Sequence, residues 1–276
     1  MTPIFGSPAI QRVLFSVAPA VALFAVPAPA QDSPPATIDI NSIKVDVVED
    51  VIIPIPQEIF ASLDKLGDQN WGRHLGDREV KLDGNRSRTA LIFGLVISDG
   101  FIAVQAEDRD EVKRIGREVL ELAGALGVRG EVQGHAQAII DGAENSNWAS
   151  VRRELDRARQ TVISTMKELQ DDALSDLVSI GGWLGGTRAL ASLVADNYSP
   201  DASELLHQPD LLVRIANRFE QLPARDKRGE VFGKVSETLK ALQPLMQVNG
   251  EGAVAQPTVK KISQLSTDLT DAVYKN

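Results

Sequence analysis

Apolar residues along this chain recur mostly at helical spacing. Between residues 109 and 127, Val112, Ile115, Val119, Leu122 and Leu126 form one stripe, and Gly127 is a typical helix stop. The same periodicity predicts helices over residues 132–144, 146–170, 199–206, 208–222, 227–242 and 258–274. Two further segments, 89–106 and 173–197, are apolar almost all round, which is typical of helices enclosed by other helices.

These segments predict an all-α fold with about eight or nine helices. Their starts do not recur at a fixed period, which argues against a helical repeat protein. The connections between them are short, and short connections place consecutive helices antiparallel. We therefore expect an irregular antiparallel helical bundle over residues 88–276.

The region before the bundle has a different pattern. Residues 38–56 are rich in Ile and Val and predict a short extended arm or strand. A short helix is expected over residues 57–66, with Gly67 as its stop. The next twenty residues are polar and contain several glycines, so we interpret 67–87 as a long loop. It is either a functional loop or a surface excursion anchored by Trp71 and Leu75.

The N-terminus is typical of an export signal. Arg12 precedes an apolar run over residues 13–26, and Ala28 and Ala30 place small residues at the two positions that define cleavage. The run is short for a membrane span, and Pro19 interrupts it. We expect residues 1–30 to be removed after Ala30, a flexible linker over 31–37, and a periplasmic or secreted mature protein.

Composition narrows the chemistry. The 276 residues are 43% hydrophobic and 24% charged, as in soluble globular proteins. A net charge of −9 disfavours nucleic acid as a partner. The chain has no Cys, which excludes thiol nucleophiles, thiolate metal sites and disulfides. Its three His residues stand far apart, and the common hydrolase and metalloprotease motifs are missing, so we expect no metal, no cofactor and no catalytic residue.

The apolar segment 89–106 raises the question of a membrane span, because it is almost long enough to cross a bilayer. Asp99 lies near its middle, where a charge is costly in lipid. The acidic residues that follow also suit the cytoplasmic side of a membrane poorly. We therefore expect a buried core helix and no membrane span in the mature chain.

A core helix buries Asp99, and a buried carboxylate needs a partner or a proton. Arg88 shares its stripe but lies about 16 Å away along the helix axis, too far for a direct contact. Arg188, on the other apolar segment, is the better candidate. The hypothesis is a buried Asp99–Arg188 pair that joins the two central helices.

Four glycines, in the motif GGWLGG at residues 181–186, interrupt the second apolar helix. Each costs a helix about 1 kcal/mol relative to Ala, so a compensating gain is expected. Gly181/Gly185 and Gly182/Gly186 form two small-residue stripes that allow close helix packing, and Gly94 and Ser98 form a matching stripe. We predict that the two helices cross there. A ligand pocket floored by glycine, and a helix break that offers amides to an anion, remain alternatives.

Three hypotheses of function follow. The first is an exported, non-catalytic protein that binds an unknown protein partner or has a structural role in the envelope. The second is a carrier for a small apolar or amphipathic ligand between helices 89–106 and 173–197. The third is an enzyme that uses Asp99 as acid or base. The candidate ligand-binding residues are Asp99, Gly182, Trp183, Gly186, Arg188, Asn197 and Tyr198.

Overall fold

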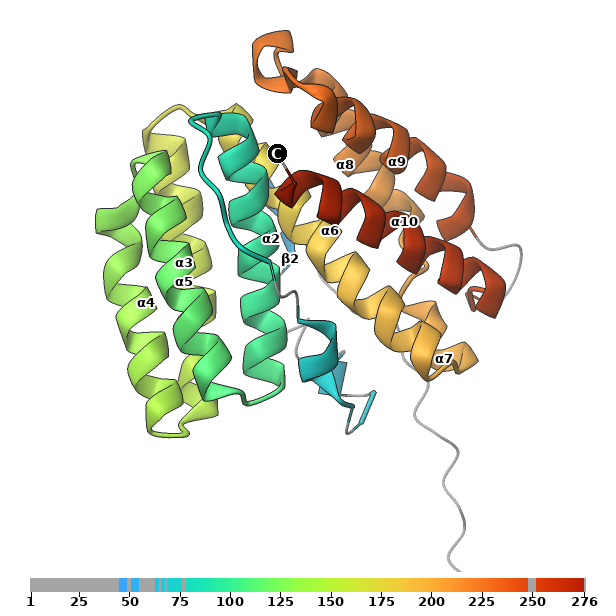
Figure 1. The fold of residues 1–276 in the computed structure, drawn as a ribbon, viewed down its shortest axis with the longest axis horizontal. Coiled ribbons are helices and arrows are strands. Elements are labelled where there is room, and N and C mark those ends of the chain that lie inside the picture. The colour runs from blue at the N-terminus through green and yellow to red at the C-terminus, as the bar shows by residue number, and fades with distance from the viewer. Residues whose placement is uncertain are drawn as a thin grey trace, which may run out of the picture. The chain divides into compact units, whose positions relative to one another are not determined.

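The structure, a computed structural model, describes residues 45–48, 51–54, 63–64, 66–67, 69–75, 78–247 and 252–275. The expected signal, the linker and most of the helix expected over 57–66 lie outside the described residues. The all-α prediction is confirmed, since helices make up most of the described chain (Figure 1).

Four helices follow one another in the first half of the bundle. They are α2 (Arg86–Gln105), α3 (Arg109–Leu126), α4 (Arg129–Glu144) and α5 (Trp148–Glu168). Each packs against the next, with tight connections between them. The Asp108 carboxylate accepts from the amides that open α3, and Gly127 ends α3 in the left-handed conformation, as its sequence predicted.

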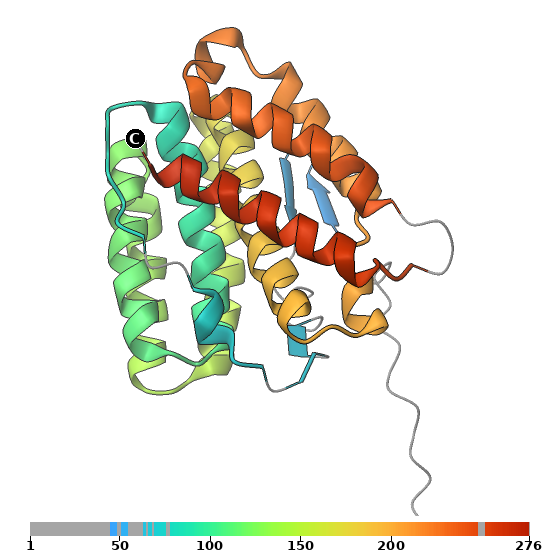
Figure 2. The ribbon, with the colours of Figure 1, turned by 45° about the vertical axis from the view of Figure 1, so that its right-hand side comes forward.

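The second half begins with α6 (Asp172–Asp196), the longest helix, and continues with α7 (Pro200–Glu204), α8 (Pro209–Gln221), α9 (Glu230–Met246) and α10 (Gln256–Tyr274). A 3-10 turn, η3 (Ala224–Lys227), precedes α9. Helix α10 packs against α6, α9 against α10, and α8 against α9 (Figures 1 and 2). Both boundaries of the helix expected over 227–242 were predicted wrongly, because α9 begins at Glu230 and continues past Pro244. A proline in the last turn removes only one late helical hydrogen bond, which the helix tolerates there.

The described part of the Ile- and Val-rich region forms a hairpin of β1 (Val45–Val48) and β2 (Val51–Pro54). The strands are antiparallel and pair Val47 with Ile52. Strand β2 lies along α6 (Figure 2). The expected extended arm is therefore, over these eight residues, a strand pair.

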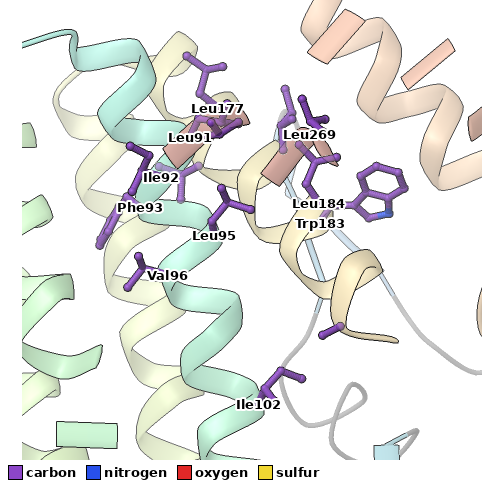
Figure 3. Packing of buried hydrophobic residues seen from close by; sticks show 14 of the residues in the cluster. Leu91, Ile92, Phe93, Leu95, Val96, Ile102, Leu177, Trp183, Leu184 and Leu269 are labelled. Carbon is purple, nitrogen blue, oxygen red and sulfur yellow. The ribbon is translucent and has the colours of Figure 1, made fainter. Parts of the chain in front are cut away.

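The two apolar helices α2 and α6 form the centre of the bundle, and they run parallel. Gly94 meets the α6 backbone at Val178 and Gly182, and Ser98, one turn later, meets Gly185. Figure 3 shows Leu91 and Leu95 of α2 on the side of α6. Between α2 and α6 the chain passes through α3, α4 and α5, and each helix runs opposite to the one before it. The chain therefore points in the same direction in α6 as in α2.

The crossing is close because glycines form it. A Cβ added to Gly94 would overlap the carbonyl oxygen of Val178 and lie 2.6 Å from the amide nitrogen of Gly182. A Cβ on Gly181 would overlap the carbonyl oxygen of Leu91 in the same way. The predicted crossing is present, and backbone packed directly on backbone compensates for the poor helix propensity of these glycines.

Helices α2 and α6 are also the two described helices that are long and apolar enough to cross a membrane, although 83% and 78% of their apolar windows are buried. Their parallel course gives a physical argument against spanning. Two parallel spans in one chain require another crossing between them, and α3 and α5 carry charged faces along their whole length. The core-helix interpretation is the one that the packing supports.

Candidate functional site

The predicted ion pair lies at the centre of the bundle. Nη2 of Arg188 donates to Oδ1 of Asp99 over 2.6 Å. Asp99 is 7% exposed and Arg188 6% exposed. Asp99 directly follows Ser98, and Arg188 lies three residues, just under one turn, after Gly185, so the close crossing brings the two side chains within reach.

A polar layer surrounds this pair, supplied by segments far apart in the sequence. The turn η2 (Trp71–His74) packs on both α2 and α6 and buries His74. Arg78 follows it and binds the carboxylate of Asp271 in α10 over 2.7 Å. The Arg78 guanidinium also lies 5.6 Å from the ring centre of Tyr274. The loop over 67–87 thus carries the anchor that its sequence predicted at Trp71, and it also connects the core to α10.

Burial governs the electrostatics of this layer. It raises the pKa of Asp99, although Arg188, Arg78 and Arg114 act in the opposite direction. Burial, together with the nearby Asp99 carboxylate, also raises the pKa of Tyr274 far above its usual range. Burial lowers the pKa of His74, helped by Arg188 and Arg73 and opposed by Asp196. Each of these groups is therefore biased toward its uncharged form.

A carboxyl with a raised pKa is a possible acid or base. Here, however, an oxygen of Asp99 already accepts from Arg188, and 90% of the Asp99 side chain is shielded from solvent. The Nε of Arg188 is buried and has no hydrogen-bond partner in the described part of the chain. A single short hydrogen bond thus joins α2 to α6 through this pair, and the Nε–H of Arg188 is a donor that the pair does not use.

The glycine motif divides between two faces of α6. Gly181 and Gly185 contact α2, whereas a Cβ on Gly182 would lie 3.7 Å from the carbonyl oxygen of Gly94 and one on Gly186 would meet no described atom within 4 Å. Both Gly182 and Gly186 are half-buried. The first of the two predicted small-residue stripes therefore forms most of the crossing, and Gly182 of the second stripe lies at its edge.

The other candidate ligand-binding residues lie apart, and their polar atoms have partners. Trp183 points away from α2 (Figure 3), and its indole N–H donates to Gln208 over 3.2 Å. Asn197, exposed at the end of α6, donates to Gln69. The Tyr198 hydroxyl donates to the carbonyl of Val254. The structure therefore brings Asp99 and Arg188 together but does not gather all seven candidates around one site.

Sequence reasoning missed two polar arrangements. Arg88 donates to the carbonyl oxygens of Val273 and Tyr274 and pairs with Asp83, so it caps the last turn of α10. His135 lies between two side chains of α5 and hydrogen-bonds both. Neither contact leaves a local pattern in the sequence, because each joins residues from different elements.

Two other kinds of polar site, a surface depression and a metal-binding cluster, are weaker candidates than the buried pair. An open depression of about 620 Å³ lies where α2 turns into α3, lined by residues that include Glu107, Asp110 and Glu144. Lys113, in its wall, already pairs with Glu144 over 2.8 Å. Within the described ranges, no group of three or more His, Asp or Glu residues is arranged to hold a metal ion.

Comparison of the chain with protein-family models, curated proteins and solved structures gives no match in any of the three. Any statement of function therefore rests on the residues and contacts described above.

Proposed function

We propose that this chain is an exported, non-catalytic helical protein that binds a protein partner in the cell envelope or has a structural role there. The observation that carries the proposal is that the polar candidates for a ligand site are occupied by internal contacts. Arg188 binds Asp99, Trp183 binds Gln208, and Tyr198 binds Val254. Such contacts hold elements together and leave these groups little capacity for a ligand.

The close crossing of α2 and α6 also weighs against a carrier. A ligand between these helices would need space at Gly94 and Gly181, where the two backbones already touch. Binding there would require the helices to separate, at a large cost in packing. The bias of Asp99 toward its neutral form does not make it an enzyme by itself, because buried structural pairs perturb pKa values as well.

The partner surface is expected to be polar. Within the described ranges, the large apolar side chains that are well exposed are Leu82, Leu169 and Val213. They come from three different parts of the chain: the loop before α2, the end of α5 and α8. Recognition through charged helical faces would show strong salt dependence.

Native mass spectrometry of the exported protein, purified without detergent, tests the proposal against the carrier alternative. We expect the mass of the polypeptide alone, as a monomer or a defined oligomer. A reproducible additional small-molecule mass would overturn the non-carrier proposal. If that small molecule binds on α6 beside Trp183, Trp183→Phe should reduce the additional mass. Asn217→Ala, at an exposed position on α8, is the control and should leave it unchanged.

Export is tested separately by N-terminal sequencing of the protein from the periplasmic and extracellular fractions. We expect the mature chain to begin at Gln31. Recovery of the intact N-terminus from the cytoplasm would contradict the export proposal and leave the question of ligand binding untouched.

A further inference from the structure

A hydroxyl, an imidazole and a carboxylate form a continuous chain between α4 and α5. Nδ1 of His135 lies 2.7 Å from Oε1 of Glu154, and Nε2 of the same ring lies 2.7 Å from Oγ1 of Thr161. Glu154 and Thr161 are both on α5, seven residues or about two turns apart, and therefore share one face. His135, from α4, bridges them.

The carboxylate determines the tautomer of the imidazole. Glu154 also accepts from Arg157, and hydrogen bonds from His135 and Arg157 lower the pKa of Glu154 against the opposing effect of its burial. An ionised Glu154 only accepts hydrogen bonds, so Nδ1 of His135 carries the proton. In the neutral ring Nε2 is then an acceptor, and the Thr161 hydroxyl must donate to it. This is the orientation that activates a hydroxyl as a nucleophile.

The chain of groups is within reach of small reagents. The side chains of His135 and Glu154 are 21% and 15% exposed, and Thr161 is half-buried. The amides around Thr161 lie inside α5 and are used by the helix, so they cannot stabilise an oxyanion. The arrangement therefore supplies general-base assistance without an oxyanion pocket from its own helix.

We propose that Thr161 is an acyl-accepting nucleophile, with His135 as its base and Glu154 as the positioning residue, and that its substrate class is the activated ester. This inference goes beyond the proposed function and is independent of it. Oγ1 of Thr161 attacks the ester carbonyl carbon while its proton passes to Nε2 of His135. The bond to the leaving group then breaks, and the leaving oxygen takes that proton. The product is an acyl ester on Thr161, with no net oxidation or reduction.

The test uses p-nitrophenyl acetate on the full-length folded protein, with acetylation of each residue measured by peptide mass spectrometry. Mapping by residue separates Thr161 from lysines, which this reagent also acetylates. Ser164, an exposed hydroxyl on the same helix with no His contact, is the internal reference. General-base assistance predicts that Thr161 is acetylated about a hundredfold faster than Ser164.

Variants separate reactivity from a structural role. His135→Gln removes the base, and Glu154→Gln removes the group that orients it, so each should abolish most of the rate advantage. Thr161→Ser keeps the hydroxyl with less crowding and should label at least as fast as the natural residue. Circular dichroism checks that each variant is folded. Equal rates at Thr161 and Ser164, or an unchanged rate in a folded His135→Gln protein, would overturn the proposal.

Discussion

The close crossing of α2 and α6 makes Gly94→Ala a severe substitution despite its small size. The added methyl group would overlap the carbonyl oxygen of Val178 and lie 2.6 Å from the amide nitrogen of Gly182. Both atoms belong to backbone inside α6, so neither can move alone. The two helices must separate along the crossing, which also strains the Asp99–Arg188 pair one to two turns away.

The magnitude follows from two opposing effects. Replacing Gly by Ala inside a helix stabilises it by about 1 kcal/mol. Forcing an extra methyl group into a packed core costs about 1–3 kcal/mol, and more where backbone must move. At Gly94 the second effect dominates, and we expect a net loss of about 2 kcal/mol. For a domain of this size, that lowers the melting temperature by about 4–8 °C.

Gly186→Ala is the matched control, because its Cβ would meet no described atom within 4 Å. There the helix gain remains without the clash, and the melting temperature should rise by about 2–4 °C. Both variants are compared by thermal unfolding followed by circular dichroism. If Gly94→Ala were as stable as Gly186→Ala, the argument for backbone contact at the crossing would be wrong.

A size exchange across the crossing gives an independent check. A Cβ on Gly185 would collide mainly with the Ser98 side chain. Gly185→Ala alone should therefore destabilise the protein, and adding Ser98→Gly should recover part of the loss. A double-mutant cycle measures the coupling, which we expect to be at least about 0.5 kcal/mol. Strictly additive effects would mean that the two residues do not touch.

Three further predictions concern charged groups. Asp99→Asn leaves the permanently charged Arg188 buried without its carboxylate and should cost about 3–5 kcal/mol at neutral pH. Arg188→Met should cost less, because the buried Asp99 can then take up a proton; equal losses of stability in urea unfolding would contradict this ranking. The pKa of His74 is lowered in the folded protein, so as the pH falls the unfolded chain binds a proton at this residue first. The free energy of unfolding should therefore fall as the pH drops below 6.5, the ordinary pKa of histidine. His74→Gln should weaken this pH dependence in thermal unfolding measured across a pH series. Arg88→Met should expose the amides of the last turn of α10, near Tyr274, to faster hydrogen exchange, with protection elsewhere unchanged.

Several elements could be predicted from the sequence because their cause is local. The stripe from Val112 to Leu126 and the stop at Gly127 define α3, and Ser199 with Pro200 opens α7. The burial of Asp99 could be predicted because it is the one charged residue near the middle of an apolar segment. Arg188 could be chosen as its partner because it is the cation within the other segment of that kind.

The rest depended on which elements meet. No spacing in the sequence indicates that Arg78 binds Asp271, or that η2 packs on both α2 and α6. Gly182 and Gly186 have the same spacing as Gly181 and Gly185, yet only the latter pair faces α2 directly, whereas Gly182 lies at the edge of the contact and Gly186 outside it. The rotation of α6 about its own axis decided between them, and packing against α2 and α10 sets that rotation.

The sequence alone therefore determined most of the described helices, several of their ends and the need to bury and pair Asp99, because hydrogen bonds and side-chain periodicity act over a few residues. The tertiary structure alone decided which glycines of α6 face α2, that Arg78 binds Asp271, and that His135 joins Thr161 to Glu154. These contacts join residues at least 19 positions apart. Such contacts form only when whole helices pack, and each depends on the shape of both partners.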